Sequence, residues 1–390
     1  MNASSHNDIV IIGGGPIGSV LALALEGSGK RVCLLEARAA PAPSDDPRTL
    51  ALSYSSRLVL ERIGVWPELA VTPIKTISIS QQNRFGRAEL DASRENLPAL
   101  GYVVRYGALM QALQRRLAAS TLMQSYDSKV ETLDVTPSYA AIGYRHAGQS
   151  LLITAQLAAI ADGAGSLLTL SGSRRHRRDY AQHAIVAEVA TSRGHANIAY
   201  ERFTPSGPAA LLPIEQRYAL VWTVAPDQVE DILVLPDAAF LARLQAHFGE
   251  RAGRFVAVGK RNAFPLQLTY AERVTSARTV LIGNAAQSLH PVAGQGINLG
   301  MRDAWALAQH IQQHGDGDIG TAGFLDAYRR RRLLDSTGGI FFTDALVRLF
   351  SNQAAGLAAA RGVALAAFDM LDPLKRFVVR RMTLGASRTS

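Results

Sequence analysis

The chain lacks the features that mark several classes of protein. Its 390 residues include one cysteine, Cys33, so no internal disulfide can form and a reducing, cytoplasmic location is indicated. Cys33 lies in the apolar run RVCLLEA, which predicts a place in the core. The first ten residues lack the basic start and apolar stretch of a secretory signal. The most apolar late stretch, residues 354–368, is Ala-rich and interrupted by Arg361, too weak to span a bilayer. We therefore expect a protein that is soluble or peripheral at the inner membrane.

Other absences narrow the class further. The 33 glycines show no period, which excludes a collagen-like chain. The 41 Lys and Arg exceed the 32 Asp and Glu by nine, a balance that favours anionic partners such as phospholipid. The basic residues cluster at 174–178, at 329–332 and in the tail at 375–381, and a solvated surface explains each cluster equally well. No nucleic-acid motif accompanies them, so we predict no nucleic-acid partner. No metal site is predicted.

The N-terminal segment has the pattern of a strand, a helix and a second strand. Asp8–Gly15 is a short apolar run rich in β-branched residues, typical of a buried strand. Residues 16–29 follow with helical apolar spacing, and Arg31–Ala37 forms a second apolar run. These pieces make a βαβ unit of about thirty residues, the unit that opens a dinucleotide-binding fold.

The first turn of this unit carries a phosphate-binding fingerprint. Gly13, Gly15 and Gly18 have the G-x-G-x-x-G spacing, in which the glycines permit a tight turn, backbone approach to a pyrophosphate, and close packing of helix on strand. The helix N-terminus attracts phosphate. Glu36 ends the second strand, where a carboxylate accepts hydrogen bonds from a ribose diol. The alternative is a glycine-rich turn without a ligand, and the motif alone does not separate FAD from NAD.

Three further positions are candidate cofactor contacts. Arg48 follows a Pro- and Ala-rich loop and precedes a segment with helical spacing, Leu50–Ile63, that stops at Gly64. Arg105 precedes a helix with a leucine stripe. A long apolar strand ends in Asp162-Gly163. Taken singly, Arg48 is also explained as a surface charge and Asp162-Gly163 as an ordinary turn.

The segment 278–311 is the most informative in the chain. VLIG predicts a short buried strand, and the residues after it predict a tight turn in which Asn284 can bond a ribityl hydroxyl. His290-Pro291 then stops regular structure, and a glycine-opened loop leads to a helix beginning near Leu299. Such a loop presents backbone N–H groups and a helix dipole to a flavin ring. The candidate cofactor contacts here are Gly283, Asn284, Pro291, Gly294, Gln295, Gly296, Ile297 and Asn298.

These motifs, in this order, resemble those of the class A flavoprotein monooxygenases, the family of p-hydroxybenzoate hydroxylase. The stretches RTLALSYSSRLVLERIGVW, ERFTPSGPAALLPI, GNAAQSLHPVAGQGINLGMRDAW and FTDALVRLFSN are similar to the ubiquinone-biosynthesis hydroxylases within it. The wider family often has Asp where this chain has Asn284, whereas the ubiquinone branch has Asn. The segment around Arg105 is less typical of the branch.

The resemblance implies an α/β fold with a Rossmann-like, discontinuous FAD-binding domain. That domain would comprise residues 1–75, 100–170 and 275–335. Residues 76–99 and 171–274 would form an interleaved β-sheet substrate domain, and 336–390 a helical C-terminal region. Alternating runs such as TISISQQ and ALVWTVA are consistent with strands, and ERFTPSGPAALLPI with a strand–turn–strand.

The resemblance also implies an activity. FAD would be the cofactor and NAD(P)H and O2 the cosubstrates for hydroxylating the ring of a polyprenylated phenol of the 2-octaprenyl-6-methoxyphenol type, through a flavin C4a-hydroperoxide. Partners would be a membrane surface or a multiprotein ubiquinone-biosynthesis complex. No catalytic acid or base is identified, since His290 beside a proline is better explained as shaping a turn. Rival activities are an FAD-dependent prenyl reductase, a halogenase, although no W-x-W-x-I-P run is present, and a non-catalytic FAD-binding subunit.

Overall fold

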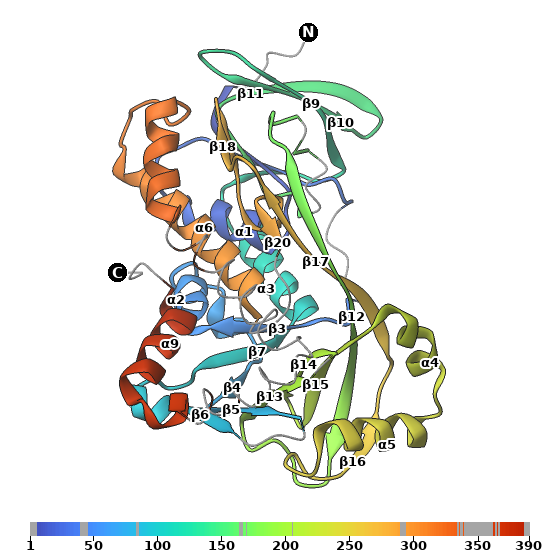
Figure 1. Cartoon of the computed structure of the whole chain (residues 1–390). Helices are drawn as coiled ribbons and strands as arrows, with labels where there is room; N and C mark the ends of the chain where they lie inside the picture. Colours follow the sequence, from blue (N-terminus) through green and yellow to red (C-terminus); the bar gives the residue numbers. More distant parts are fainter. Residues whose placement is uncertain are drawn as a thin grey trace.

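The structure is a computed structural model in which two large β-sheets lie one above the other with helices packed between and around them (Figure 1). It describes residues 6–39, 46–82, 86–163, 167–168, 170–204, 206–288, 294–333, 335, 338, 362, 365 and 367–385.

The upper sheet has eight strands and a parallel centre in the order β19-β11-β1-β2-β8. The antiparallel strands β18, β10 and β9 extend it. Its strands are β1 (His6–Ile12), β2 (Val32–Leu35), β8 (Met123–Ser125), β9 (Ser128–Val135), β10 (Ala140–His146), β11 (Gln149–Ile160), β18 (Thr275–Ser276) and β19 (Thr279–Leu281). The central strands are apolar throughout because a parallel sheet is covered on both faces.

Helices cover one face of this sheet and strands the other. Ile9 and Ile11 of β1 pack against the helices α1 (Pro16–Ala24), α3 (Tyr106–Ala118) and α6 (Gln295–Gln313). Val10 and Cys33 face the opposite way, against Ile142 of β10. The prediction that Cys33 belongs to the core is confirmed, and burial raises the pKa of its thiol to about 11.

The lower sheet has nine strands in the order β20-β17-β12-β15-β14-β13-β5-β6, with β16 beside β12. They are β5 (Thr76–Gln81), β6 (Arg87–Asp91), β12 (Arg175–Thr191), β13 (Ile198–Thr204), β14 (Gly207–Ile214), β15 (Arg217–Val224), β16 (Phe255–Val258), β17 (Asn262–Ala271) and β20 (Gln287–Ser288). The predicted strand–turn–strand is confirmed as β13 and β14, and the two alternating runs as β5 and β15.

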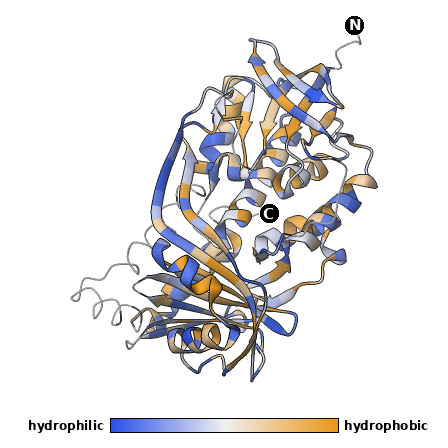
Figure 2. Ribbon diagram, turned by 90° about the vertical axis from the view of Figure 1, so that its right-hand side faces the viewer, coloured by the Kyte–Doolittle hydropathy of each residue, from blue (hydrophilic) through white to orange (hydrophobic). Residues whose placement is uncertain are grey.

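The outer face of the lower sheet is covered by α4 (Val229–Val234) and α5 (Asp237–Phe248). Trp222 of β15 packs there against Phe240 and Leu244 of α5. The long strand β12 is hydrophilic in its exposed first half and hydrophobic where it enters this sheet (Figure 2). Because α4 and α5 cover the outer face of the lower sheet, the inner face of the sheet is the one that can line a cavity.

A three-stranded sheet, β3 (Thr49–Ser53), β7 (Gly101–Arg105) and β4 (Thr72–Ile74), lies between the two large ones. The remaining elements are α2 (Tyr54–Arg62), α9 (Asp372–Leu384) and the short 3-10 helices η1 (Trp66–Glu68), η2 (Ala92–Glu95), η3 (Pro226–Gln228) and η4 (Gly283–Ala285). Within the described part of the chain, no helix combines the length and the apolar content that crossing a membrane requires.

Two predicted helix starts are wrong. The segment predicted as a helix from Leu50 is a strand as far as Ser53, because it pairs with β7 and because the Ser53 hydroxyl then accepts the Ser56 N–H and caps α2. The helix expected near Leu299 begins at Gln295, after Gly294, whose φ of 60° only glycine adopts readily. The residues predicted as a loop are therefore the first turn of α6.

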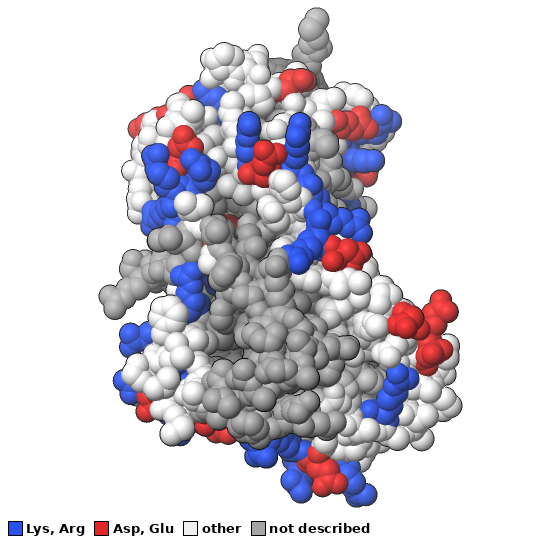
Figure 3. Space-filling view, in the orientation of Figure 1, with Lys and Arg blue, Asp and Glu red and all other residues white. Residues whose placement is uncertain are grey.

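The basic clusters are only partly surface features. Residues 174–178 are exposed, but Arg332 and Lys375 are 4% and 7% exposed. Arg332 is bonded to Asp303 and Asp335, and Lys375 to Asp369. The solvated-surface interpretation is therefore wrong for these two. On the face in Figure 3 the described Lys and Arg side chains are interspersed with Asp and Glu.

Candidate functional site

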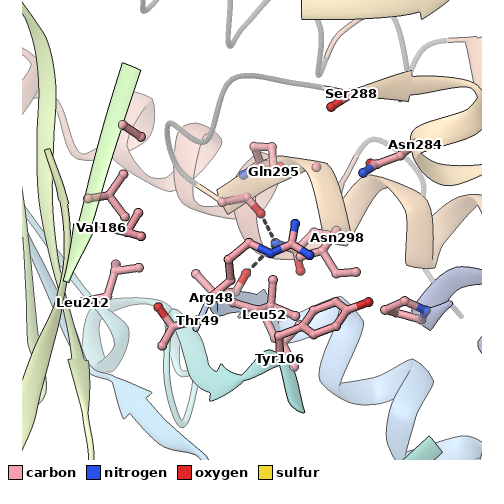
Figure 4. A pocket seen from close by; sticks show the side chains of 18 of the residues that line it. Arg48, Thr49, Leu52, Tyr106, Val186, Leu212, Asn284, Ser288, Gln295 and Asn298 are labelled. Carbon is pink, nitrogen blue, oxygen red and sulfur yellow. Dashed lines mark hydrogen bonds between the residues drawn. The ribbon is translucent and has the colours of Figure 1, made fainter. Parts of the chain in front are cut away.

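A cavity of about 1890 Å³ lies between the helix-covered upper sheet and the inner face of the lower sheet. The predicted site residues line it, except Gly18 and Gly283, which lie behind its wall, and Pro291, which is outside the described residues. Segments far apart in the sequence thus meet around one space, as the close-up of Arg48, Tyr106, Asn284 and Gln295 shows (Figure 4).

The glycines of the first turn have distinct roles. A Cβ on Gly13, at φ 110°, would lie 2.6 Å from the Ala161 carbonyl oxygen, and one on Gly18 would lie 1.9 Å from the Gly13 carbonyl oxygen. These two permit the close packing of the turn on β11 and α1. Gly15 is different: it caps α1, lines the cavity, and has no protein atom within 4 Å of where a Cβ would stand. The turn leaves that space for a ligand beside a helix N-terminus.

Glu36 follows β2 and lies under this turn. Its carboxylate accepts the Gly14 N–H at 2.6 Å and the Arg38 Nε at 2.8 Å. Burial opposes ionisation of Glu36, but the hydrogen bonds and charge of Arg38 and the Gly14 N–H lower its pKa overall. The carboxylate is therefore an anionic acceptor at the cavity edge, and Arg38, which no motif indicated, holds it in place.

Arg48 and Arg105 are both held by carboxylates. Arg48 bonds Asp46 at 2.5 Å and lies 4.9 Å from the centre of the Tyr106 ring. Arg105, the residue before α3, bonds Glu215 at 2.9 Å and also Glu188 of β12. Arg105 thus ties the helical layer to the lower sheet.

The N-terminus of α6 forms another wall. Gly294 to Ile297 line the cavity, and Gly296 has no protein atom within 4 Å of a Cβ position. The N-cap residue of α6, Gly294, has no side chain and so supplies no capping hydrogen bond to the first turn.

Asn298 uses its side chain within the protein. Its Oδ1 accepts from the Ser53 N–H and the Ser56 hydroxyl, both at 2.7 Å, and its Nδ2 donates to the carbonyls of Ala51 and Gly294. All four hydrogen-bonding positions of the amide are occupied. Asn298 therefore positions the helix start against β3, and only its backbone is available to a ligand.

The two remaining motifs close the cavity. Gly283, at φ 61°, would bring a Cβ within 2.9 Å of Ile17, so it packs η4 on α1, while the exposed Asn284 lines the cavity. Asp162 lines it too, and accepts the Leu167 N–H at 3.0 Å; the adjacent Gly163 has φ 67°.

An apolar arm of the cavity was not predicted. It runs between β5, β6 and the C-terminal residues, where Leu90 packs in one cluster with Val379 of α9. The side chains that line it include Ile77, Ile79, Leu90, Phe368, Val378 and Met382. The alternation in TISISQQ indicated one buried face of β5, but no sequence signal paired that face with α9.

The chain matches a protein family described as "FAD binding domain" over residues 6–337. It is 35% identical to the ubiquinone hydroxylase UbiL of Rhodospirillum rubrum, covering 97% of this chain and 90% of the relative. It is 31% identical to the 3-demethoxyubiquinol 3-hydroxylase of Escherichia coli, covering 95% and 96%. The fold is similar to that of the p-nitrophenol 4-monooxygenase PnpA of Pseudomonas putida, with a TM-score of 0.79, 19% identity, and coverage of 99% and 100%.

Proposed function

This chain belongs to the FAD-binding-domain family of flavoprotein hydroxylases, and from that premise we propose that it hydroxylates the aromatic ring of a polyprenylated phenol in ubiquinone biosynthesis. FAD is its cofactor, with NAD(P)H and O2 as cosubstrates. The observation that carries the proposal is that, within the described residues, one cavity joins the N-termini of α1 and α6 to a long apolar arm. FAD suits the end with the helix N-termini, and a substrate with a phenolic ring and an isoprenoid tail suits the space between that end and the arm.

The residues at the end of the cavity formed by the N-termini of α1 and α6 fit FAD. The N-terminus of α1 with Gly15 would face the pyrophosphate, and Glu36 a ribose, since a helix N-terminus attracts phosphate and a carboxylate accepts from a diol. The α6 N-terminus with Gly296 would face the ring system, where its dipole favours negative charge. Asn284, Asp162 and Arg48 would line the chain that joins the two. Bound FAD supplies electron transfer from NAD(P)H and activation of O2.

The protein's own part is to position the phenol and to exclude water. Val186 and Leu212 of the lower sheet face Arg48 and Thr49 across the cavity (Figure 4), which leaves a flat apolar wall for an aromatic ring. Dry walls of this kind protect a reactive oxygen species from decay by water. An already electron-rich ring reacts there once it is held close to the α6 N-terminus.

The apolar arm suits the tail. Transfer of a tail of about 40 carbons from water to an apolar environment is favourable by roughly 30 kcal/mol, at ~0.8 kcal/mol per CH2. Non-covalent binding saturates near roughly 20 kcal/mol, so the protein does not extract the whole tail from a membrane. We infer that the arm holds the units next to the ring and that the rest of the tail stays in lipid.

The test is hydroxylation of 2-octaprenyl-6-methoxyphenol, or a shorter-chain analogue, by the FAD-loaded chain. We expect O2 consumption that depends on NAD(P)H and phenol, and a product one oxygen heavier. A product two hydrogens heavier without O2 uptake would indicate a prenyl reductase, and a halide-dependent product a halogenase. If the bound FAD is not reduced under any of these conditions, the result would indicate a non-catalytic FAD-binding subunit. In cells, a deletion strain should accumulate a quinone precursor that lacks one ring oxygen.

A further inference from the structure

One carboxyl group of the cavity wall has no part in the proposed cofactor site. Glu201 lies on β13, paired with Ile79 of β5 on one side and Ala210 of β14 on the other. Alternate residues of a strand share a face, and Ala199, Glu201 and Phe203 all line the cavity. The Glu201 carboxyl therefore faces the space between the sheet and the helices.

Glu201 is unpaired in apolar surroundings. Among the described residues the lower sheet contributes two carboxylates to the cavity lining, and the other one, Glu188, is bonded to Arg105. Glu201 forms no hydrogen bond or ion pair with any residue in the described ranges, and burial raises its pKa to about 8. An unpartnered carboxyl in a hydrophobic wall is costly for the fold, and groups of this kind gather at functional sites.

The position of Glu201 places it where the substrate ring would lie. Its partner Ile79 packs in the cluster that Phe368 and Val379 form under α9, at the apolar arm. On the other side, Leu212 follows Ala210 by two residues on the same face of β14 and looks across to Arg48 and Thr49 (Figure 4). Glu201 therefore lies between the arm for the tail and the end of the cavity assigned to the flavin.

We propose that Glu201 accepts the proton of the substrate's phenolic hydroxyl, an inference that rests on the proposed function. The phenolic O–H bond breaks, the proton goes to a carboxylate oxygen of Glu201, and the electron pair stays on the phenolic oxygen. Delocalisation of that pair raises the electron density at the ring carbons ortho and para to the phenolic oxygen, and the electrophilic oxygen adds to one of these carbons. As the ring C–O bond forms, the O–O bond of the activated O2 breaks and its second oxygen leaves as water, with NAD(P)H as the source of the two electrons. The attacked ring carbon then loses its own hydrogen as a proton to water, and the Glu201 carboxylic acid returns its proton to the phenolic oxygen, which restores the aromatic ring and the carboxylate.

This role has a definite pH dependence. Because the pKa of Glu201 is raised, the residue is a neutral acid below about pH 8 and becomes a proton acceptor above it. Its direct partners on the adjacent strands, Ile79 and Ala210, are apolar, Gln81 follows Ile79 by two residues on the same face of β5, and the neighbouring Tyr200 hydroxyl donates to the Arg251 carbonyl. Other charged groups lining the cavity are Glu188, Arg217 and Lys260 on the side of the lower sheet. On the side of the upper sheet and the helices they are Glu36, Arg38, Arg48, Arg105, Lys129, Glu131 and Asp162.

The test compares wild type, Glu201→Gln and Glu201→Asp as full-length, FAD-loaded proteins. With NAD(P)H and a geranylated methoxyphenol, we expect the wild-type kcat to rise as the pH passes about 8. Glutamine removes the rise and lowers kcat above that pH by roughly 100-fold, within the range for general base catalysis. Aspartate restores the rise in part. The control is Glu89→Gln, an exposed carboxylate on β6 that does not line the cavity, and it should follow the wild type.

A second readout needs no turnover. Binding of the same phenol to the FAD-loaded protein without NAD(P)H, followed by fluorescence, should tighten several-fold above about pH 8 in wild type, because a charged acceptor makes the stronger hydrogen bond. Glutamine should abolish that change. A Glu201→Gln protein that keeps the wild-type kcat and both pH profiles overturns the role of Glu201 alone. A wild type that binds the phenol but never hydroxylates it overturns the proposed function, and the proton transfer with it.

Discussion

At the scale of single residues, the three glycines of the G-x-G-x-x-G motif have different structural roles. Gly13 and Gly18 are required by contacts as short as 1.9 Å to the backbone, whereas Gly15 has open space before it. A substitution at Gly18 therefore tests folding, and one at Gly15 tests the ligand. The same distinction applies to Gly283, which packs on Ile17, and Gly296, which faces the cavity.

We expect Gly15→Val to yield a folded protein that retains little FAD. A Cβ at Gly15 has open cavity space around it, so thermal unfolding of the apoprotein should change little, while the FAD absorbance per protein should fall at least tenfold. Gly323→Val is the matched control, since Gly323 also has no atom within 4 Å but is exposed and outside the cavity. A Gly15→Val preparation that is still yellow, and so still holds FAD, would mean that the pyrophosphate does not bind beside Gly15.

A second residue-scale prediction concerns a buried ion-pair network behind the site. Asp303 accepts from Arg332 at 2.5 Å and from Gln287 at 2.9 Å, and Asp335 accepts from both Arg332 and Arg302 at 2.7 Å. Asp303→Asn removes one of the two carboxylates that bond the buried Arg302 and Arg332 within the described residues, which should lower the free energy of unfolding by about 3 kcal/mol in urea. Asp326→Asn, an exposed partner of Arg329, should change it by less than about 1 kcal/mol. Equal effects would mean that the network contributes nothing specific.

At the scale of elements, the sequence predicted local units well and their lengths less well. The G-x-G-x-x-G turn, the strand before Asp162 and the helix after Arg105 are confirmed because each depends on near neighbours in the chain. The start of α2 was wrong because Leu50–Ser53 also has helical spacing, and only pairing with β7, some fifty residues away, makes it a strand.

The sequence predicted only those site residues that belong to local motifs, because a motif depends on residues close together in the chain. Arg38 and the side chains of α9 lie in segments without a motif, and Glu201 lies in a stretch that indicated the family but no site residue. All of them reach the cavity through sheet order and tertiary packing. The segment ERFTPSGPAALLPI predicted a strand–turn–strand, which β13 and β14 confirm. It did not indicate that one face of β13 would line a cavity, or that Glu201 would be unpaired there.

Helix α9 offers an element-scale test of the apolar arm. Val378 lines the cavity, whereas its neighbour Phe377 is 65% exposed. In detergent solution, Val378→Glu should lower kcat/KM for an octaprenyl phenol at least tenfold more than for an unprenylated one, because the carboxylate must be desolvated when the tail binds. Phe377→Glu should leave the ratio unchanged. Equal losses for both substrates would mean that the tail binds somewhere other than beneath α9.

At the scale of the whole molecule, the proposed prenylated substrate raises the question of how a molecule whose tail would remain in lipid reaches the cavity. The outer side of α9 and the residues before it expose Met370, Leu371 and Phe377 at 84%, 51% and 65%, and the exposed Arg376 and Arg380 lie among them. This combination of apolar and basic side chains suits a surface that lies on anionic lipid. It is carried by the same helix that lines the arm, so docking would bring the cavity to the membrane.

We therefore expect the protein to sediment with vesicles that contain anionic lipid, and less so as salt rises, since the charges are exposed and screened. Phe377→Glu should weaken this binding several-fold and lower turnover of vesicle-embedded substrate, although it leaves turnover in detergent unchanged. Val378→Glu should show the reverse pattern, with intact vesicle binding and impaired turnover in detergent. If neither variant alters vesicle binding, or if the wild type does not sediment at all, delivery depends on a lipid-carrying protein partner instead. The two adjacent residues thus separate docking on the membrane from binding of the tail.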